Sequence, residues 1–323
     1  MTKEKILCIL REHPDAFVSG ASLADRLQLS RTAVWKAIRQ LKADGYEIEA
    51  VTNQGYRLLS GSDVLSAEGI TRYLKHKEEI APRVFPTLTS TNTVLKSLAA
   101  EDAPAGTAVL AAGQTAGRGR LGRSFWSPSA SGLYLSLLLR PDLAPADAPR
   151  LTSCAAVAAA EAVAELSGRE TGIKWVNDVY MDGKKICGIL TEAGMDLESG
   201  QVSYVVVGIG INLRTPVGGF PEEIRHVAGA AFDGLSVPDL RNRLAARVLD
   251  KLADYGADPF SDQLFEAYRK RSFVPGKRIT ILVPGKEPVQ AEALYLNRDY
   301  SLQVRLDDGS EQKLASGEVS IRF

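Results

Sequence analysis

Residues 107–140 read TAVLAAGQTAGRGRLGRSFWSPSASGLYLSLLLR, and this stretch decides the fold of the central region. Residues 107–112 and 132–140 are apolar, with leucines alternating along the second segment, so both predict strands. The residues between them spell GxGxxG. A dinucleotide-binding fingerprint must open a helix, whereas Ser124-Phe125-Trp126-Ser127-Pro128 follows here. We therefore reject a dinucleotide site at this position.

Residues 117–123 form an arginine- and glycine-rich loop, which we call the Arg/Gly loop. It holds Arg118, Arg120 and Arg123 among three glycines. Glycines let the backbone fold closely over a ligand, and guanidinium groups suit phosphate or carboxylate. The loop therefore predicts an anion-binding segment that is disordered until its anion arrives.

Three further segments are expected to supply polar groups to the same region. A strand over 173–181, a tight turn at Asp182-Gly183 and a return strand over 184–193 predict an antiparallel hairpin, which argues against a doubly wound parallel sheet. Lys174 lies there among bulky apolar neighbours. A partly buried ammonium needs an anionic partner, and this is either a ligand or an acid such as Asp178.

The other two segments are an apolar strand and a helix start. The strand over 201–213 contains Gly208-Ile209-Gly210, which indicates close approach of the backbone to a ligand, and Asn212 near its end. Ser90-Thr91-Asn92 either caps a helix over 93–100 or hydrogen-bonds a polar ligand ring, and it can do both.

The chemistry that these segments suit is the meeting of two anions. The sequence shows no evident Ser/His/Asp triad, catalytic cysteine or metal cluster. A carboxylate attacking the α-phosphate of a nucleotide needs positioning and charge stabilisation rather than a protein nucleophile.

Residues 1–62 predict a winged helix-turn-helix. Ser22 is expected to cap a second helix and Ser30 a third, Gly45 ends the third, and a hairpin turning at 53–55 forms the wing. The third helix is basic and has no acid over 31–42, so it predicts DNA contact by a dimer on two half-sites. The candidate DNA-contacting residues are Ser30, Arg31, Thr32, Trp35, Lys36 and Arg39.

Composition narrows the protein class. Lys+Arg and Asp+Glu are both 39, so net charge is zero and the chain is not basic throughout. Three scattered cysteines and three distant histidines predict no disulfide framework and no metal site. No signal peptide and no apolar stretch of about 20 residues is evident, so we expect no membrane partner and a cytoplasmic location. Domains are expected over 1–62, 65–272 and 275–323, with a linker at Gly61-Ser62 and a β module turning at Pro284-Gly285 and Asp308-Gly309.

Taken together, these motifs resemble the bifunctional biotin–protein ligases that are also biotin-operon repressors. The resemblance rests on Ser90-Thr91-Asn92 and on GQTAGRGRLGRSFWSP, GLYLSLLL, KWVNDVY, KKICGIL and GIGINL, in that order. It implies an α+β multidomain fold. This has a winged helix-turn-helix, a mixed α/β ligase domain with a largely antiparallel sheet like that of class II synthetases, and a small C-terminal SH3-like β-barrel.

The resemblance also implies the reaction and its partners. ATP and biotin would give biotinyl-5′-AMP, with Mg²⁺ expected but its ligands unknown. A lysine on a biotin carboxyl carrier domain of acetyl-CoA or pyruvate carboxylase would then accept the biotin. The chain would also bind operator DNA as a homodimer when it holds biotinyl-5′-AMP.

Roles follow by motif position. The catalytic residues would be Lys174, Arg118 and Arg120. Residues 214–231 resemble the loop that binds the adenylate. The substrate-binding residues would be Ser90, Thr91, Asn92, Gln114, Arg118, Gly119, Arg120, Lys174, Gly188, Gly210 and Asn212.

Two positions depart from the family pattern, and two other functions stay open. Val176 stands where proline is frequent, and Leu121 stands where a further basic residue is frequent. One alternative is a lipoate-type acyl–protein ligase, which the polar groups Ser90-Thr91-Asn92 and Gln114 disfavour. The other is a ligand-sensing regulator without ligase activity, which would have no need for Lys174, Arg118 and Arg120.

Overall fold

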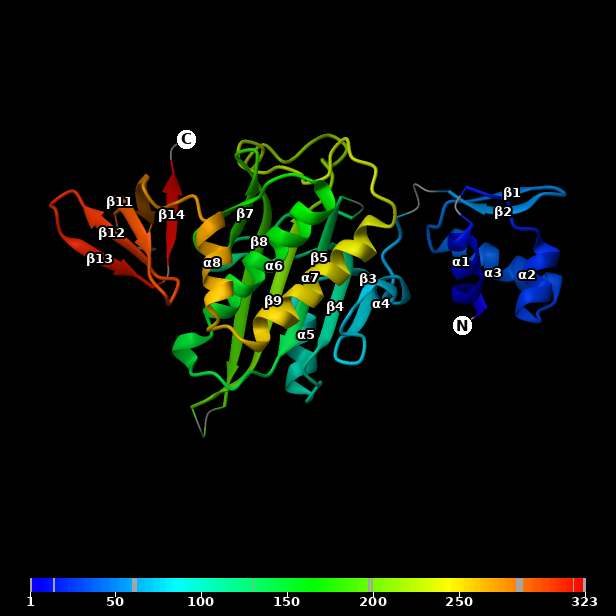
Figure 1. Cartoon of the computed structure of the whole chain (residues 1–323), viewed down its shortest axis with the longest axis horizontal. Coiled ribbons are helices and arrows are strands. Elements are labelled where there is room, and N and C mark those ends of the chain that lie inside the picture. The colour runs from blue at the N-terminus through cyan, green and yellow to red at the C-terminus, as the bar shows by residue number, and fades with distance from the viewer. Residues whose placement is uncertain are drawn as a thin grey trace. The chain divides into compact units, whose positions relative to one another are not determined.

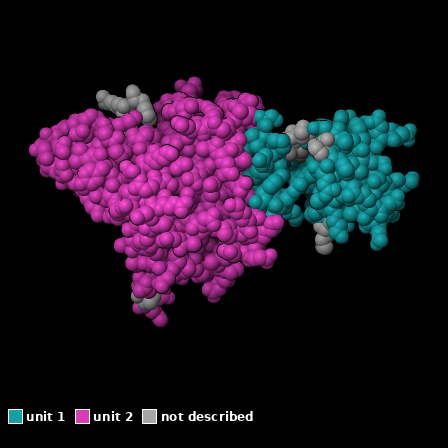
Figure 2. All heavy atoms as spheres, in the orientation of Figure 1, with its two compact units in different colours: residues 1–73, 236–243 teal, residues 74–235, 244–323 magenta. Residues whose placement is uncertain are grey.

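The structure is a computed structural model that describes residues 2–13, 15–59, 63–129, 131–196, 198, 200–282, 287–315 and 317–321. The chain divides into two compact units (Figures 1 and 2). Unit 1 holds residues 1–73 and 236–243, and unit 2 holds 74–235 and 244–323. The predicted linker Gly61-Ser62 and the predicted turn Pro284-Gly285 lie outside the described residues.

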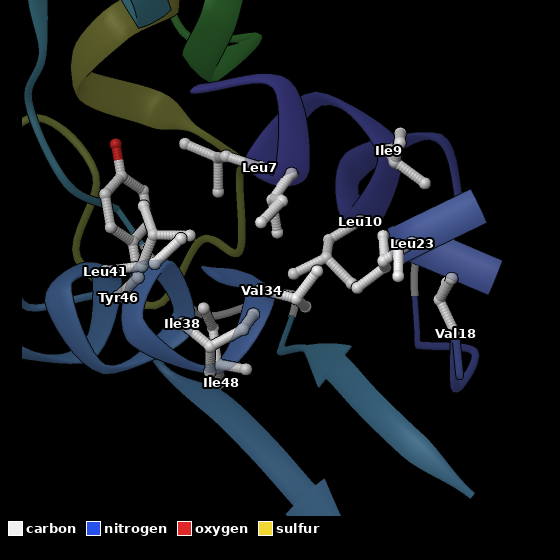
Figure 3. Packing of buried hydrophobic residues seen from close by; sticks show 13 residues of the cluster. Leu7, Ile9, Leu10, Val18, Leu23, Val34, Ile38, Leu41, Tyr46 and Ile48 are labelled. Carbon is white, nitrogen blue, oxygen red and sulfur yellow. The ribbon is translucent and has the colours of Figure 1, made fainter. Parts of the chain in front are cut away.

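Unit 1 contains a winged helix-turn-helix, as predicted. Helices α1 (Thr2–Glu12), α2 (Gly20–Leu27) and α3 (Arg31–Ala43) precede an antiparallel hairpin of β1 (Ile48–Val51) and β2 (Gly55–Leu58). Apolar side chains spaced along the three helices converge on one core, and Figure 3 shows them meeting. These include Leu7, Leu10, Leu23, Val34, Ile38 and Leu41.

The helix caps are partly as predicted. The Ser30 hydroxyl accepts the Ala33 amide at 3.1 Å and so caps α3. The predicted cap of α2 at Ser22 is wrong, because the helix begins three residues earlier. The hydroxyl of Ser19 accepts the Ser22 amide at 3.0 Å instead. Gly45 has the positive φ of 96° expected of a residue that follows a helix.

Unit 2 is built on a seven-stranded mixed sheet, in the order β3-β4-β5-β9-β8-β7-β6. Of the adjacent strand pairs, β3–β4 is parallel and the others are antiparallel, which confirms a largely antiparallel sheet. The strands are β3 (Ala81–Leu88), β4 (Thr107–Gln114), β5 (Gly132–Leu139), β6 (Gly172–Lys174), β7 (Asp178–Met181), β8 (Lys184–Met195) and β9 (Val202–Asn212).

The predicted single strand over 173–181 is wrong. The chain reverses at residues 175–177, so β6 and β7 are separate strands that pair with each other, with Lys174 opposite Asp178. Buried polar contacts fix this reversal. The Trp175 indole donates to the Tyr300 carbonyl at 2.8 Å, and the Asn177 amide donates to the Ile189 carbonyl at 2.9 Å. The turn at Asp182-Gly183 is confirmed.

Two helices cover opposite faces of the sheet. Neighbouring residues of a strand point to opposite sides, so the contacts of two consecutive residues of β8 distinguish the two faces. Figure 1 shows α6 (Arg150–Ser167) lying across the strands. Thr191 of β8 bonds Thr152 of α6 at 2.8 Å. The next residue, Glu192, contacts α5 (Thr91–Ala100) on the other face. The candidate site lies on this α5 face.

Three more helices complete the described α-helical structure. They are α4 (Ala67–Tyr73), α7 (Leu240–Ala257) and α8 (Asp262–Arg271). Short 3₁₀ turns are η1 (Arg120–Gly122) and η2 (Pro145–Asp147). Among the described residues, no helix combines the length and the apolar character that crossing a membrane requires.

The C-terminal strands form an antiparallel sheet in the order β13-β12-β11-β10-β14. The turn at Asp308-Gly309 is confirmed between β12 and β13. Over the described residues the sheet is open, with β13 and β14 at its edges, so the predicted closed barrel is not seen. The strands are β10 (Arg278–Leu282), β11 (Val289–Leu296), β12 (Leu302–Leu306), β13 (Glu311–Leu314) and β14 (Glu318–Ile321).

Candidate functional site

One pocket in unit 2 brings together nearly all the predicted substrate-binding residues. They come from the start of α5, the end of β4, the Arg/Gly loop, β6, and facing positions of β8 and β9. The predicted residues that line the pocket are Ser90, Thr91, Asn92, Gln114, Arg118, Gly119, Arg120, Lys174, Gly188 and Gly210.

A hydrogen-bonded polar cluster lies at the start of α5. The side-chain oxygen Oε1 of Gln114 accepts hydrogen bonds from the Thr91 backbone amide at 2.8 Å and from the Thr91 hydroxyl at 3.2 Å. The Gln114 amide nitrogen donates to the Ser127 hydroxyl at 3.0 Å. Ser90 is the N-cap residue of α5 but makes no side-chain capping bond. The cluster therefore fixes the side chain of Gln114 against the helix start.

Ser136 connects this cluster to Asn92 and was missed from the sequence. Its hydroxyl is fully buried and lies 2.8 Å from the Thr91 hydroxyl and 2.6 Å from Asn92 Oδ1. Asn92 Nδ2 donates to the Leu190 carbonyl at 3.1 Å and to Glu192 at 2.9 Å. Ser136 was recognisable as the lone small polar residue in the run GLYLSLLL.

The Arg/Gly loop folds into a small hairpin. The Gly119 amide donates to the Arg123 carbonyl at 2.8 Å, and the Phe125 amide donates to the Gly117 carbonyl at 2.9 Å. Arg120 donates to Asn177 Oδ1 at 3.0 Å. Arg118 Nη1 lies 3.3 Å from Glu192 Oε1. The expected disorder-to-order change of this loop on binding an anion stays a prediction.

Lys174 is partly buried, as predicted. Its Nζ atom lies 6.0 Å from the centre of the Tyr180 ring. Asp178 lies opposite it across β6 and β7, and its carboxylate is 2.6 Å from Lys185 Nζ. Lys185 also lines the pocket and was missed from the sequence. The pocket thus gathers lysines and arginines from three separate segments.

Two facing glycines form the floor beneath Phe125. Gly188 and Gly210 pair across β8 and β9. A Cβ atom would lie 3.0 Å from the Phe125 ring at Gly188 and 2.5 Å at Gly210. Asn212 lies outside the pocket lining and donates to the Gly229 carbonyl at 3.1 Å. We expected a ligand to approach the backbone closely at these glycines. The Phe125 ring occupies that space instead.

Charge at the α5 end of the pocket centres on Glu192. Burial favours its neutral form, but hydrogen bonds from Lys96 and Asn92 outweigh this and lower its pKa below the usual range. Within the described residues, no cluster of three or more His, Cys, Asp or Glu could hold a metal ion. Asp178 is the one acid among the described residues that line the pocket, and one carboxylate does not make a cage for Mg²⁺.

Hydrogen bonds fix the first residues of segment 214–231, which is predicted to bind the adenylate. Arg214 donates to the carbonyls of Phe232 and Leu235, and the Thr215 amide donates to Asp233 at 2.8 Å. Phe220 meets Trp126 edge to face, with ring centroids 6.0 Å apart. This aromatic contact places Phe220 beside residues 124–128, which follow the Arg/Gly loop.

The predicted DNA-contacting residues lie together on one exposed face of α3. The side chains of Arg31, Thr32, Lys36 and Arg39 are exposed, and Trp35 is 48% exposed. The Arg39 guanidinium lies 4.7 Å from the centre of the Trp35 ring. The opposite face of α3 is buried in the core of unit 1. This is the arrangement that a recognition helix requires.

Comparison with known proteins assigns a class to two regions of the chain. Residues 84–212 match the biotin/lipoate A/B protein ligase family, and residues 2–57 match a helix-turn-helix domain. The biotin protein ligase of Aquifex aeolicus, solved with biotin and ATP, has a TM-score of 0.60 and 26% identity. The likeness covers 75% of this chain and 98% of that one. The fold and pocket therefore define a ligase domain accompanied by a helix-turn-helix domain.

Two relatives specify the family further. The bifunctional ligase/repressor BirA of Bacillus subtilis is 40% identical over 227 residues, 70% of this chain and 69% of that protein. BirA of Escherichia coli is 34% identical over 61% of this chain and 60% of that protein. The chain belongs to the family of bifunctional biotin–protein ligases and repressors.

Proposed function

We propose that this protein joins biotin to ATP, giving biotinyl-5′-AMP and pyrophosphate, and then transfers biotin to a carrier lysine. The carrier is a biotin carboxyl carrier domain of acetyl-CoA or pyruvate carboxylase. The supporting observation is a single pocket in which the cationic side chains of Arg118, Arg120 and Lys174 lie beside the polar cluster of Thr91 and Gln114.

The first step needs the two reactant anions held in contact. The biotin carboxylate attacks the α-phosphorus of ATP, and the bond to pyrophosphate breaks. Lys174, Arg118 and Arg120 stabilise the charge that gathers on the phosphoryl oxygens. Mg²⁺, when bound with ATP, neutralises charge on the phosphate oxygens.

The polar cluster is proposed to bind the biotin ring, with different roles inside it. Both groups of the Asn92 amide are engaged, by Ser136 on one side and by Leu190 and Glu192 on the other. Asn92 therefore shapes the pocket wall. Gln114 is also engaged on both sides, but its side-chain nitrogen donates one N–H to Ser127 and has a second N–H to offer a ligand. Ser90, Thr91 and Gln114 are therefore proposed to bond the ring. Gly119 lets the loop approach the ligand closely, Gly188 and Gly210 leave room for the Phe125 ring in the pocket, and Asn212 holds the 214–231 segment through Gly229.

In the second step the carrier lysine attacks the acyl carbon of the mixed anhydride, and AMP leaves. The test of both steps is incubation of the full chain with biotin, ATP and a carrier domain, followed by mass spectrometry of the carrier. Biotinyl lysine is the expected product. Carrier left unmodified would favour a ligand sensor, and faster transfer of lipoate than of biotin would favour a lipoate ligase.

We also propose that the chain represses biotin genes by binding operator DNA as a homodimer loaded with biotinyl-5′-AMP. The exposed basic face of α3 supports this role. In the same proposal the chain works in the cytoplasm. Its functional domains are 1–62, 65–272 and 275–323, of which the second is related to class II synthetases and the third to SH3-like domains. Gel shift on the operator, together with sedimentation with and without biotin and ATP, tests the DNA and dimer claims.

A further inference from the structure

Glu192 of β8 contacts two residues that line the pocket, Asn92 and Arg118, and also Lys96 of α5. It is on the α5 face of the sheet, beside the polar cluster. Its Oε2 atom accepts from Asn92 at 2.9 Å, and its Oε1 atom accepts from Lys96 of α5 at 2.8 Å. The same Oε1 atom lies 3.3 Å from Nη1 of Arg118 in the Arg/Gly loop.

The exposures of these groups separate a fixed anchor from a movable partner. The side chain of Glu192 is 18% exposed, whereas that of Arg118 is 48% exposed. Asn92, which holds the other carboxylate oxygen, is 3% exposed. The carboxylate is thus held by the sheet and helix, and the arginine of the loop comes to it. An ion pair with one partner already fixed loses less entropy on forming than a pair of two mobile side chains.

The Arg/Gly loop then has two anchors on different elements. Arg118 reaches Glu192 on β8, and Arg120 reaches Asn177 in the turn between β6 and β7. The contact with Glu192 uses one terminal nitrogen of Arg118. A guanidinium carries five N–H groups in a planar fork, so others can bond an anionic ligand at the same time.

We propose that Glu192 is a positioning residue that holds Arg118 over the pocket and thereby slows release of the acyl-adenylate intermediate. This role rests on the proposed function, because it needs an intermediate to retain. Glu192 does not touch the reacting atoms. It acts through Arg118, so its loss should affect retention of the intermediate far more than its formation.

The test is the rate at which preformed biotinyl-5′-AMP leaves the full-length protein, measured by chase with excess unlabelled intermediate. In Glu192→Gln the amide oxygen can still accept from Asn92, but the charge that holds Arg118 is gone. Release is expected to be about fivefold to tenfold faster than in the wild type. Pyrophosphate formation with biotin and ATP should fall by a smaller factor, because Lys174 and Arg120 still stabilise the phosphoryl oxygens.

Lys96→Met is the matched control, because it removes the other cation on the same carboxylate oxygen. If Glu192 acts through Arg118, release from this variant stays within about twofold of the wild type, even if its melting temperature falls. Equal acceleration in Lys96→Met and Glu192→Gln would mean that Glu192 only holds α5, and the proposal would be overturned.

A double variant makes the coupling explicit. Arg118→Gly alone should speed release, and adding Glu192→Gln should speed it no further, because both substitutions remove the same contact. Additive effects would contradict the proposal. Should Glu192→Gln fold poorly, Glu192→Asp keeps the charge while shortening its reach, and it too should release faster. If the wild-type chain forms no adenylate, the proposed function fails, whereas unchanged release from both Glu192 variants overturns this inference alone.

Discussion

Helix α3 and the Arg/Gly loop are both basic segments without a single acid, but their cationic side chains make different contacts. Arg31, Lys36 and Arg39 stand exposed along one face of α3. In the loop, Arg118 contacts Glu192 and remains 48% exposed, and Arg120 contacts Asn177. The exposed face suits a large polyanion that approaches from solvent, and the pocket suits a small anion that is enclosed.

This contrast shows that the secondary structure of a basic segment determines how its cationic side chains are ordered for a ligand. A helix presents its cations by its own period, so α3 needs no other element to order them. The loop has no such period, so groups elsewhere in the chain must order its arginines. Substitutions in the two regions should therefore have different effects. Variants of the pocket should lose ligation, and variants of α3 should lose DNA binding.

Lys174→Ala should give the largest effect. Removal of a preorganised charge beside the reacting groups is expected to lower the adenylation rate by about 10²–10³. Pyrophosphate release with biotin and ATP measures this. Lys270→Ala is the control, since Lys270 is an exposed lysine in the last turn of α8. An active Lys174→Ala protein would refute the catalytic role.

The double substitution Arg31→Ala and Arg39→Ala should give the complementary loss. Operator affinity is expected to fall, and the slope of log affinity against log salt to flatten by about one unit for each phosphate contact removed. Ligation of biotin to the carrier should stay at the wild-type rate. Gel shifts at several salt concentrations measure the slope, and an unchanged slope would mean that α3 does not bind the backbone of DNA.

How far the sequence could predict each region follows from the same contrast. The exposed face of α3 was predictable because Val34, Ile38 and Leu41 share one side of a regular helix. An anion site at the Arg/Gly loop follows from the composition of the loop and stays a prediction. The direction of Arg118 was not, because Glu192 lies far along the chain and meets the loop only when β8 is in its register. The chain reversal after Lys174 was also hidden, since Trp175 and Asn177 bond residues far along the chain, Tyr300 and Ile189.

The pocket's own construction can be tested by a pair of alanine substitutions on β9. At Gly208 a Cβ atom would lie 2.0 Å from Oδ1 of Asn92, and three hydrogen bonds prevent Asn92 from moving away. At Gly210 it would lie 2.5 Å from the Phe125 ring, which is half-buried and can shift. Gly208→Ala should cost about 2 kcal/mol of unfolding free energy and Gly210→Ala clearly less. Urea unfolding measures both, and equal costs would contradict the rigid polar cluster.

Leu121→Arg tests whether the loop's positive charge limits retention of the intermediate. Leu121 is 56% exposed at the tip of the hairpin, so an arginine there is accommodated without repacking. A further cation beside an anionic intermediate should slow its release by about twofold to fivefold, the size expected of a solvent-exposed charge pair. The chase experiment measures the rate. Unchanged release would show that the contacts of Arg118 with Glu192 and of Arg120 with Asn177 control retention, and that the total charge of the loop does not.

The smallest expected effect lies outside both basic regions, at His76. A hydrogen bond to Asp254 at 2.8 Å and a second contact with Glu79 at 3.4 Å raise the pKa of His76, although burial opposes this. Because the folded protein binds this proton more tightly than the unfolded chain, the stabilisation is complete below the unfolded pKa and is lost as pH rises through the folded one. Between pH 5.5 and pH 8.5 the melting temperature of the wild type should fall by about 2 °C more than that of His76→Gln. Parallel curves for the two proteins would show that the imidazole contributes nothing through its charge, while DNA binding and ligation should be the same in both at either pH.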